Sequence, residues 1–305
     1  VKPDVVFYGG NAGMNAGKLE KTGIKSFSID GTPAYNVGTS FSTPWVSRMA
    51  AELTHLVKEE FDPLLIRALL IHNAKYPANN SMSMTDKVTQ MGFGAPSSVQ
   101  EMLYNSEDEI TLILRDTLEK GSFIEMFDFP FPESLVDKDG NFVGQIIVTL
   151  VTKSLLDDKQ AGEYCQSNID ILFGTYETET DRDTSKKGIK NPKGLEEPQN
   201  ILLESLYSAR VKGAHPFTGF ERECTLVKYG KKFHPVKKYA IDLSEMTTSN
   251  RQRYLRGDRK WYLKIEGLYR DFIEQDAHAR NYQLSQEYCL LLTIRDPNGK
   301  APVYD

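Results

Sequence analysis

The chain has little cysteine, no long apolar run and no excess of positive charge. Its 305 residues include three cysteines, and 37 Lys and Arg stand against 42 Asp and Glu, for a formal net charge of −5. A negatively charged body argues against nucleic-acid binding, and no apolar run reaches the length of a membrane span. We therefore expect neither a nucleic-acid partner nor a membrane partner.

The three cysteines, Cys165, Cys224 and Cys289, are widely spaced. An odd number without framework spacing is typical of reduced thiols, which favours a cytoplasmic protein. His215, His234 and His278 are dispersed, and none of them has a metal-ligand spacing to a cysteine or to another histidine. We expect no metal and no other cofactor. The length is enough for two domains of ordinary size.

The clearest chemical signal is GTSFSTP at residues 38–44, which runs into the apolar pattern WVSRMAAELTHLV. Apolar residues recur there at spacings of three and four, which predicts a helix over residues 43–58. The Gly-Thr-Ser turn would present the hydroxyl of Ser40 at the helix start, where unpaired N–H groups and the positive dipole end stabilise a developing negative charge. An acyl-transfer nucleophile needs such surroundings. The alternative is that Ser40 only caps the helix.

The same segment resembles GTSxAxP, the active-site serine motif of the subtilisin-like serine peptidases (subtilases). Three further stretches resemble family segments in the right order: KPDVVFYGG at 2–10, LIRALLIHNAKY at 65–76 and MGFGAPSSVQEML at 91–103. Ser42 departs from the pattern, since alanine is usual there. The resemblance covers roughly residues 1–105. It implies that Ser40 is the nucleophile and an oxyanion donor through its N–H, with Gly38, Thr39, Thr43 and Pro44 supporting the site.

The resemblance also implies what is missing. In subtilases the catalytic triad runs Asp, His, Ser along the chain, and few residues precede Ser40. We therefore expect the C-terminal portion of a longer serine endopeptidase, with the triad aspartate, the histidine and the oxyanion asparagine on an upstream segment. The alternative is a non-catalytic module that binds a partner and is built on a subtilase remnant. The resemblance implies a protein or peptide substrate, and its bacterial intracellular-type subgroup suggests an AAA-type ATPase partner.

No residue within the sequence replaces the missing base convincingly. His55 lies on the same predicted helix as Ser40, on the order of 20 Å away along the axis. His72 lies in an apolar helical pattern and is interpreted as a packing histidine. Asp4 and Asn11 resemble structural positions of the family, and not the triad acid or the oxyanion asparagine.

The periodicity of the sequence changes near residue 106. Before it, we expect strands at 2–9 and 24–29 and further helices at 63–74 and 96–103. Residues 1–105 are thus expected to be an α/β subtilase-type fragment with a parallel sheet and a buried serine helix. Short apolar runs separated by turns predict an antiparallel β-sandwich or jelly-roll-like domain over 106–305. The predicted strands are 110–118, 121–131, 143–153, 169–176, 224–230, 237–243, 260–270 and 288–296.

Three polar stretches of the second half have separate interpretations. Residues 177–200 are almost wholly polar, which predicts a mobile excursion from the domain. DKDGN at 137–141 resembles the start of a calcium loop but lacks the later glutamate, so a hairpin turn is favoured. KYGKKFHPVKK at 228–238 is either a phosphate-contacting patch or, as we favour, a solvated hairpin with exposed lysines.

Overall fold

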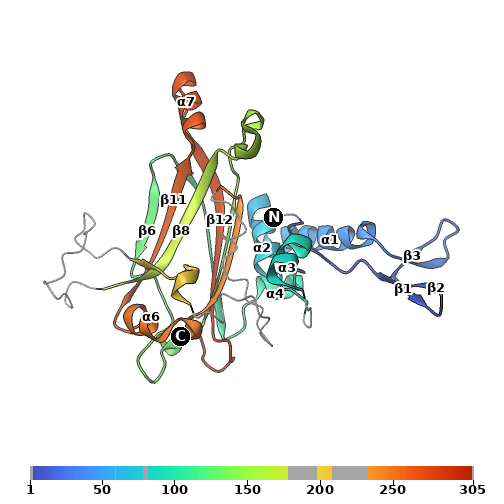
Figure 1. Ribbon diagram of the computed structural model, residues 1–305, viewed down its shortest axis with the longest axis horizontal. Helices are drawn as coiled ribbons and strands as arrows, with labels where there is room; N and C mark the ends of the chain where they lie inside the picture. The colour runs from blue at the N-terminus through green and yellow to red at the C-terminus, as the bar shows by residue number, and fades with distance from the viewer. Residues whose placement is uncertain (1–2, 59, 78–81, 178–197, 208–232, 304–305) are drawn as a thin grey trace. The chain divides into compact units, whose positions relative to one another are not determined.

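In the computed structural model the chain divides into two compact units, Val1–Tyr104 and Asn105–Asp305, which are described separately. The structure describes residues 3–58, 60–77, 82–177, 198–207 and 233–303 (Figure 1). The predicted strand at 224–230, Cys224 and most of the polar stretch 177–200 lie outside these residues. No helix in the described part is long and apolar enough to cross a membrane.

The first unit contains two hairpins followed by helices. β1 (Asn11–Asn15) pairs with β2 (Lys18–Thr22), and β3 (Ile24–Phe27) pairs with β4 (Pro33–Asn36). The helices are α1 (Thr39–Val57), α2 (Pro63–His72), α3 (Met84–Met91) and α4 (Val99–Leu103). The predicted strand at 24–29 and the three predicted helices are confirmed, whereas the patterns did not predict α3.

Local sequence explains where α2 and α4 begin. Asp62 Oδ1 accepts hydrogen bonds from the N–H groups of Leu64, at 2.8 Å, and Leu65, at 3.2 Å, while a proline fills the first helical position. At α4, Ser98 and Glu101 form a reciprocal capping box. Both helix starts therefore follow from residues at most three positions apart.

A parallel sheet, a strand at 2–9 and a buried serine helix were also expected, and the described residues of this unit show none of them. Their strand pairing is antiparallel. Residues 3–10 are irregular and are held by single hydrogen bonds, such as Val6 N to Gly94 O at 3.0 Å and Phe93 N to Asp4 O at 2.8 Å. An extended apolar segment becomes a sheet strand only beside a partner strand. In α1, Leu53 alone is buried.

The second unit is built on two four-stranded antiparallel sheets (Figure 1). One has the strand order β10-β7-β12-β5, and the other has the order β6-β11-β8-β9. The strands are β5 (Glu109–Glu119), β6 (Phe123–Phe127), β7 (Gln145–Thr152), β8 (Ser167–Tyr176), β9 (Gln199–Asn200), β10 (Val236–Asp242), β11 (Lys260–Tyr269) and β12 (Ser285–Arg295). The predicted strands that fall on described residues are thus confirmed. The patterns did not predict α6 (Thr248–Tyr254) or α7 (Asp271–Arg280).

One hydrophobic core receives side chains from both sheets, and β7 and β8 each supply every second residue to it. This alternation follows from the two-residue period of a strand. Trp261 of β11 lies among aromatic rings: its ring stacks on Phe131 with centroids 4.2 Å apart, and Phe142 and Phe173 pack at 5.3 and 5.1 Å. The core therefore holds the two sheets together.

The two polar stretches that fall on described residues have different outcomes. At 137–141 the turn is confirmed: the carboxylate of Asp137 accepts from the N–H groups of Asp139 and Asn141 at 3.0 and 2.9 Å. At 228–238 the favoured interpretation is wrong where the structure describes it. Lys237 and Lys238 lie within β10 and are each 3% exposed, because they belong to a strand of the sheet and not to a hairpin tip.

Candidate active site

Ser40 is the second residue of α1, and its side chain is exposed. The prediction that Ser40 lies at the N-terminal end of a helix is confirmed. The first N–H groups of a helix have no partner within it, and the aligned peptide dipoles add partial positive charge at this end. The hydroxyl and N–H of Ser40 therefore lie where a negative charge is stabilised.

Gly38, and not Ser40, occupies the capping position. Gly38 has φ 151° and ψ 165°, and the cap makes no side-chain hydrogen bond. Residues with a Cβ avoid this region of backbone conformation, which explains a glycine two positions before the serine. The alternative that Ser40 merely caps the helix is therefore wrong.

Backbone contacts hold the turn before Ser40 in place. Gly38 N donates to Gly9 O at 2.9 Å, and Phe41 N donates to Gly38 O at 3.0 Å. A Cβ at Gly9 would lie 2.9 Å from Gly38 O, closer than side chains approach. Ser42 Oγ donates to Thr39 O at 3.2 Å, which adds a local bond inside the first turn. Close backbone packing between Gly9 and Gly38 therefore fixes the turn that precedes Ser40.

The other residues that the family resemblance implies at this site lie in the first two turns of α1. Thr39 begins α1, and Thr43 and Pro44 are exposed. Proline has no N–H, so Pro44 cannot donate to the carbonyl of Ser40, four residues earlier. The carbonyl oxygen of Ser40 therefore does not accept the hydrogen bond that it would normally receive from the N–H four residues later.

The residues that were considered as replacements for the missing triad residues lie far from Ser40 along α1, are buried, or make contacts that hold the fold together. His55 lies in the last turn of α1, at the opposite end from Ser40, and His72 is buried in α2. Asp4 accepts from Arg67 Nε at 3.1 Å and Nη2 at 2.8 Å, which ties the N-terminal segment to α2. Asn11 Oδ1 accepts from the N–H of Ala12 at 2.8 Å.

Among the described residues, no group of three or more His, Cys, Asp or Glu side chains is placed to hold a metal ion. The expectation of a reaction without a cofactor stays a prediction. Sequence reasoning also missed the contact of Gly9 with the turn before Ser40. The signal that would have found it is the Gly9–Gly10 pair directly after an apolar run, since glycine in an extended segment often marks a close backbone approach.

Comparison with protein-family models finds a known family over the first part of the chain. Residues 1–97 match the model of the subtilase family, Peptidase S8. The matched segment contains Gly38, Thr39, Ser40, Thr43 and Pro44, and it ends before β5. A search of curated proteins gives no match. Residues 1–97 of this chain are therefore a region of the subtilase family of peptidases.

Proposed function

We propose that the chain is part of a subtilisin-like serine endopeptidase and that Ser40 is its nucleophile. The observation that carries the proposal is the exposed serine at the second position of α1, inside a subtilase-family region. Ser40 Oγ attacks the carbonyl carbon of the scissile peptide bond, the amine leaves with a proton, and water hydrolyses the acyl-enzyme. The N–H of Ser40 donates to the oxyanion.

In this proposal the general base, the aspartate that orients it and the second oxyanion donor lie outside residues 1–305. The positions of the nearby histidines support this, because His55 lies at the far end of α1 and His72 is buried. One oxyanion donor is worth about 3 kcal/mol of transition-state stabilisation, and a missing base costs more. We therefore expect residues 1–305 by themselves to be nearly inactive.

The proposal assigns residues 106–305 no catalytic residue. Two antiparallel sheets with a shared core support a β-sandwich that stabilises the peptidase region or holds a partner. The substrate is a protein or peptide, and an AAA-type ATPase is proposed as the partner from the family resemblance alone. The buried thiols of Cys165 and Cys289 support a reducing, cytoplasmic location.

The test is labelling with a fluorophosphonate probe, which reports an activated serine. A polypeptide extended upstream to include the missing segments should label, and Ser40→Ala should abolish the signal. Ser42→Ala is the matched control, because Ser42 lies two residues further along the same helix, and it should still label. Residues 1–305 alone should label weakly.

Two results would contradict the proposal. Strong labelling of residues 1–305 at Ser40 would mean that a base exists within the chain. A folded extended polypeptide that does not label would remove Ser40 as nucleophile and favour the binding module.

A further inference from the structure

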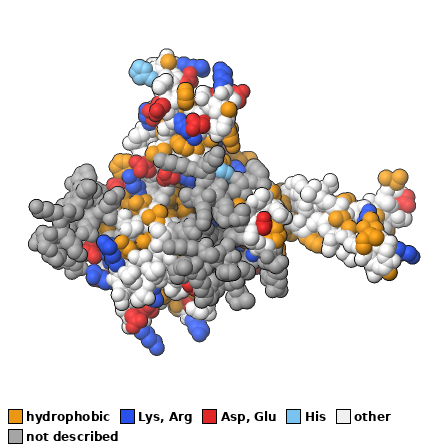
Figure 2. Space-filling view, in the orientation of Figure 1, with side chains coloured by type: hydrophobic (Ala, Val, Ile, Leu, Met, Phe, Trp, Pro, Cys, Tyr) orange, Lys and Arg blue, Asp and Glu red, His pale blue; other side chains and the backbone are white. Residues whose placement is uncertain are grey.

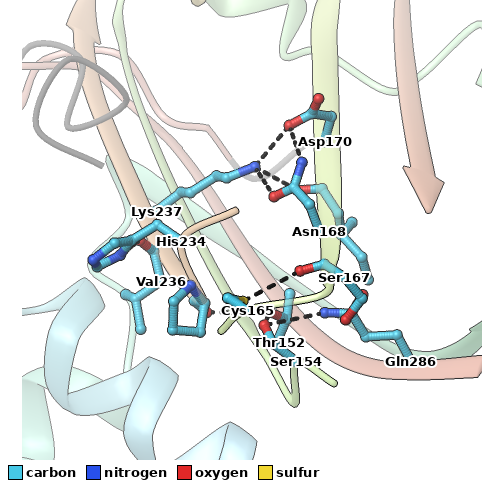
Figure 3. A network of polar contacts seen from close by, with 12 residues as sticks. Thr152, Ser154, Cys165, Ser167, Asn168, Asp170, His234, Val236, Lys237 and Gln286 are labelled. Atoms are coloured by element: carbon cyan, nitrogen blue, oxygen red, sulfur yellow. Dashed lines mark hydrogen bonds and ion pairs between the residues drawn. The ribbon is translucent and has the colours of Figure 1, made fainter. Parts of the chain in front are cut away.

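A buried amine, a buried amide and a carboxylate meet in the second unit (Figure 3). Lys237 of β10 is 3% exposed, and Asn168 of β8 is 1% exposed. Lys237 Nζ donates to Asn168 Oδ1 at 2.8 Å and to Asp170 Oδ1 at 2.7 Å. Asn168 Nδ2 donates to the same oxygen of Asp170 at 2.9 Å. One carboxylate oxygen therefore contacts both the amine and the amide.

The sheet edges explain how the three groups come together. β10 is an edge strand of one sheet, and β9 pairs with β8 of the other sheet only near the C-terminal end of β8. Among the described residues, no strand pairs with the beginning of β8 on that side. Asn168 and Asp170 are two residues apart, so their side chains leave the strand on the same face. Lys237 reaches from one sheet to this edge of β8, where Nζ also donates to Ile169 O at 2.6 Å.

The surroundings favour a reactive, neutral amine. Burial disfavours the charged form of the Lys237 amine. The Asp170 carboxylate, whose side chain is 44% exposed, lies 2.7 Å from Nζ and is placed to accept a proton from it. Tyr239, two residues along β10, is 7% exposed, and burial, and after it the charge of Asp170, raises its pKa. A neutral, desolvated lysine is a nucleophile. Its target, Cγ of Asn168, is bonded directly to the oxygen that Nζ already contacts.

We propose that Lys237 and Asn168 join in an intramolecular isopeptide bond, with Asp170 as the proton shuttle. The lone pair of Nζ attacks Cγ of Asn168, and a C–N bond forms. Asp170 transfers the proton taken from Nζ to Nδ2 of Asn168, the Cγ–Nδ2 bond breaks, and ammonia leaves. One amine and one primary amide give one secondary amide and one ammonia, so the step balances without an oxidant, a reductant or a further reactant.

The bond would covalently link β8 to β10, and so one sheet to the other. It joins residues 69 positions apart in the sequence. A cross-link over so long a loop restricts the unfolded chain strongly. The unit would therefore keep its two sheets together under conditions that separate a core held only by packing.

The experiment is denaturing intact-mass spectrometry of the full chain, followed by a proteolytic peptide map. The measured mass should be lower than the sequence mass by one ammonia, and the map should contain a branched peptide with both Asn168 and Lys237. Lys237→Arg and Asn168→Ala should each restore the sequence mass. Lys238→Arg is the matched control, because Lys238 is equally buried on the same strand but leaves it on the opposite face, and it should keep the deficit.

The wild-type chain decides the proposal even if these variants do not fold. A folded wild-type chain at its full sequence mass would overturn it. A deficit of one ammonia without the branched peptide would also overturn it, because asparagine can lose ammonia by cyclising on its own backbone. Asp170→Asn tests the shuttle: it should carry the full mass expected for its sequence, and a cross-link formed at the wild-type rate would remove Asp170 from the mechanism. None of these readouts depends on peptidase activity.

Discussion

At the scale of single residues, Gly38 decides whether Ser40 can occupy the end of α1. Its φ of 151° belongs to a region that residues with a Cβ avoid. The order Gly-Thr-Ser was enough to predict a turn that exposes the serine. It was not enough to predict that Gly38 N donates to Gly9 O, because that bond joins segments far apart in the chain.

We expect Gly38→Ala to slow fluorophosphonate labelling of Ser40 in the upstream-extended polypeptide. The Cβ strains the turn by about 1–3 kcal/mol, which displaces the hydroxyl and N–H of Ser40 together. Gly13→Ala is the control, since a Cβ there meets no atom within 4 Å, and its labelling rate should equal that of the wild type. Equal rates for Gly38→Ala and the wild type would show that the turn does not position the serine.

Among the described residues of the second unit, the one with the most aromatic packing to lose is Trp261. We expect Trp261→Ala to lower the free energy of unfolding by about 3–5 kcal/mol, because it empties a site between three aromatic rings. Trp261→Phe should cost clearly less. It keeps a ring against Phe131, and it removes an indole N–H that has no hydrogen-bond partner among the described residues. Urea unfolding of the full chain measures both, and equal losses would contradict the packing argument.

At the scale of elements, side-chain hydrogen bonds organise the turn between β3 and β4. Asp30 accepts from the hydroxyl of Ser28, and from Thr32 Oγ1 at 2.8 Å and Thr32 N at 3.1 Å. These bonds, first that of Ser28 and then those of Thr32, lower the pKa of Asp30 to about 2. The carboxylate is therefore the form that the folded hairpin favours.

The sign of the resulting pH dependence follows from this shift. The ordinary pKa of an aspartate is about 3.9, and a lowered folded-state pKa means that the ionised group stabilises the hairpin. This contribution is fully present above pH about 4 and is lost as the pH falls towards about 2. Carboxyl NMR titration should give a midpoint well below the ordinary value, and Asp30→Asn should remove this part of the pH dependence. A midpoint near the ordinary value would contradict the turn geometry.

At the scale of the whole molecule, the first unit exposes many large apolar side chains. Tyr8, Phe27 and Phe61 are 58, 76 and 64% exposed, and apolar side chains lie at the surface of the hairpin region of this unit (Figure 2). Large exposed apolar patches mark interaction sites or a tendency to aggregate. We therefore expect the stability of this unit to depend on further surface that covers these side chains.

We expect a shortened chain ending at Asn105 to be poorly soluble and to unfold without a cooperative transition. Residues 106–305 should be soluble and unfold cooperatively, because both of their sheets contribute side chains to one hydrophobic core. Size-exclusion chromatography and thermal unfolding of both pieces measure the difference. A soluble, cooperatively melting monomer of residues 1–105 would show that this unit has a sufficient core of its own.

The sequence by itself determined the local features. Apolar spacing predicted α1, the Asp62-Pro63 pair predicted the start of α2, and short apolar runs predicted the strands of the second unit. Residues within a few positions of one another decide these features, through periodicity, capping and turn chemistry. The exposed place of Ser40 belongs to this group, since one turn and one helix create it.

Only the tertiary structure decided the features that depend on distant residues. Residues 2–9 were predicted as a strand, but whether an apolar segment pairs depends on the neighbour that folding brings beside it. The lysines of 228–238 were predicted to be solvated, yet Lys237 is buried and its amine meets Asn168 across 69 positions of sequence. The local sequence pattern cannot predict this contact, because the packing of the two sheets brings the amine of Lys237 to the amide of Asn168, and spacing along the chain does not.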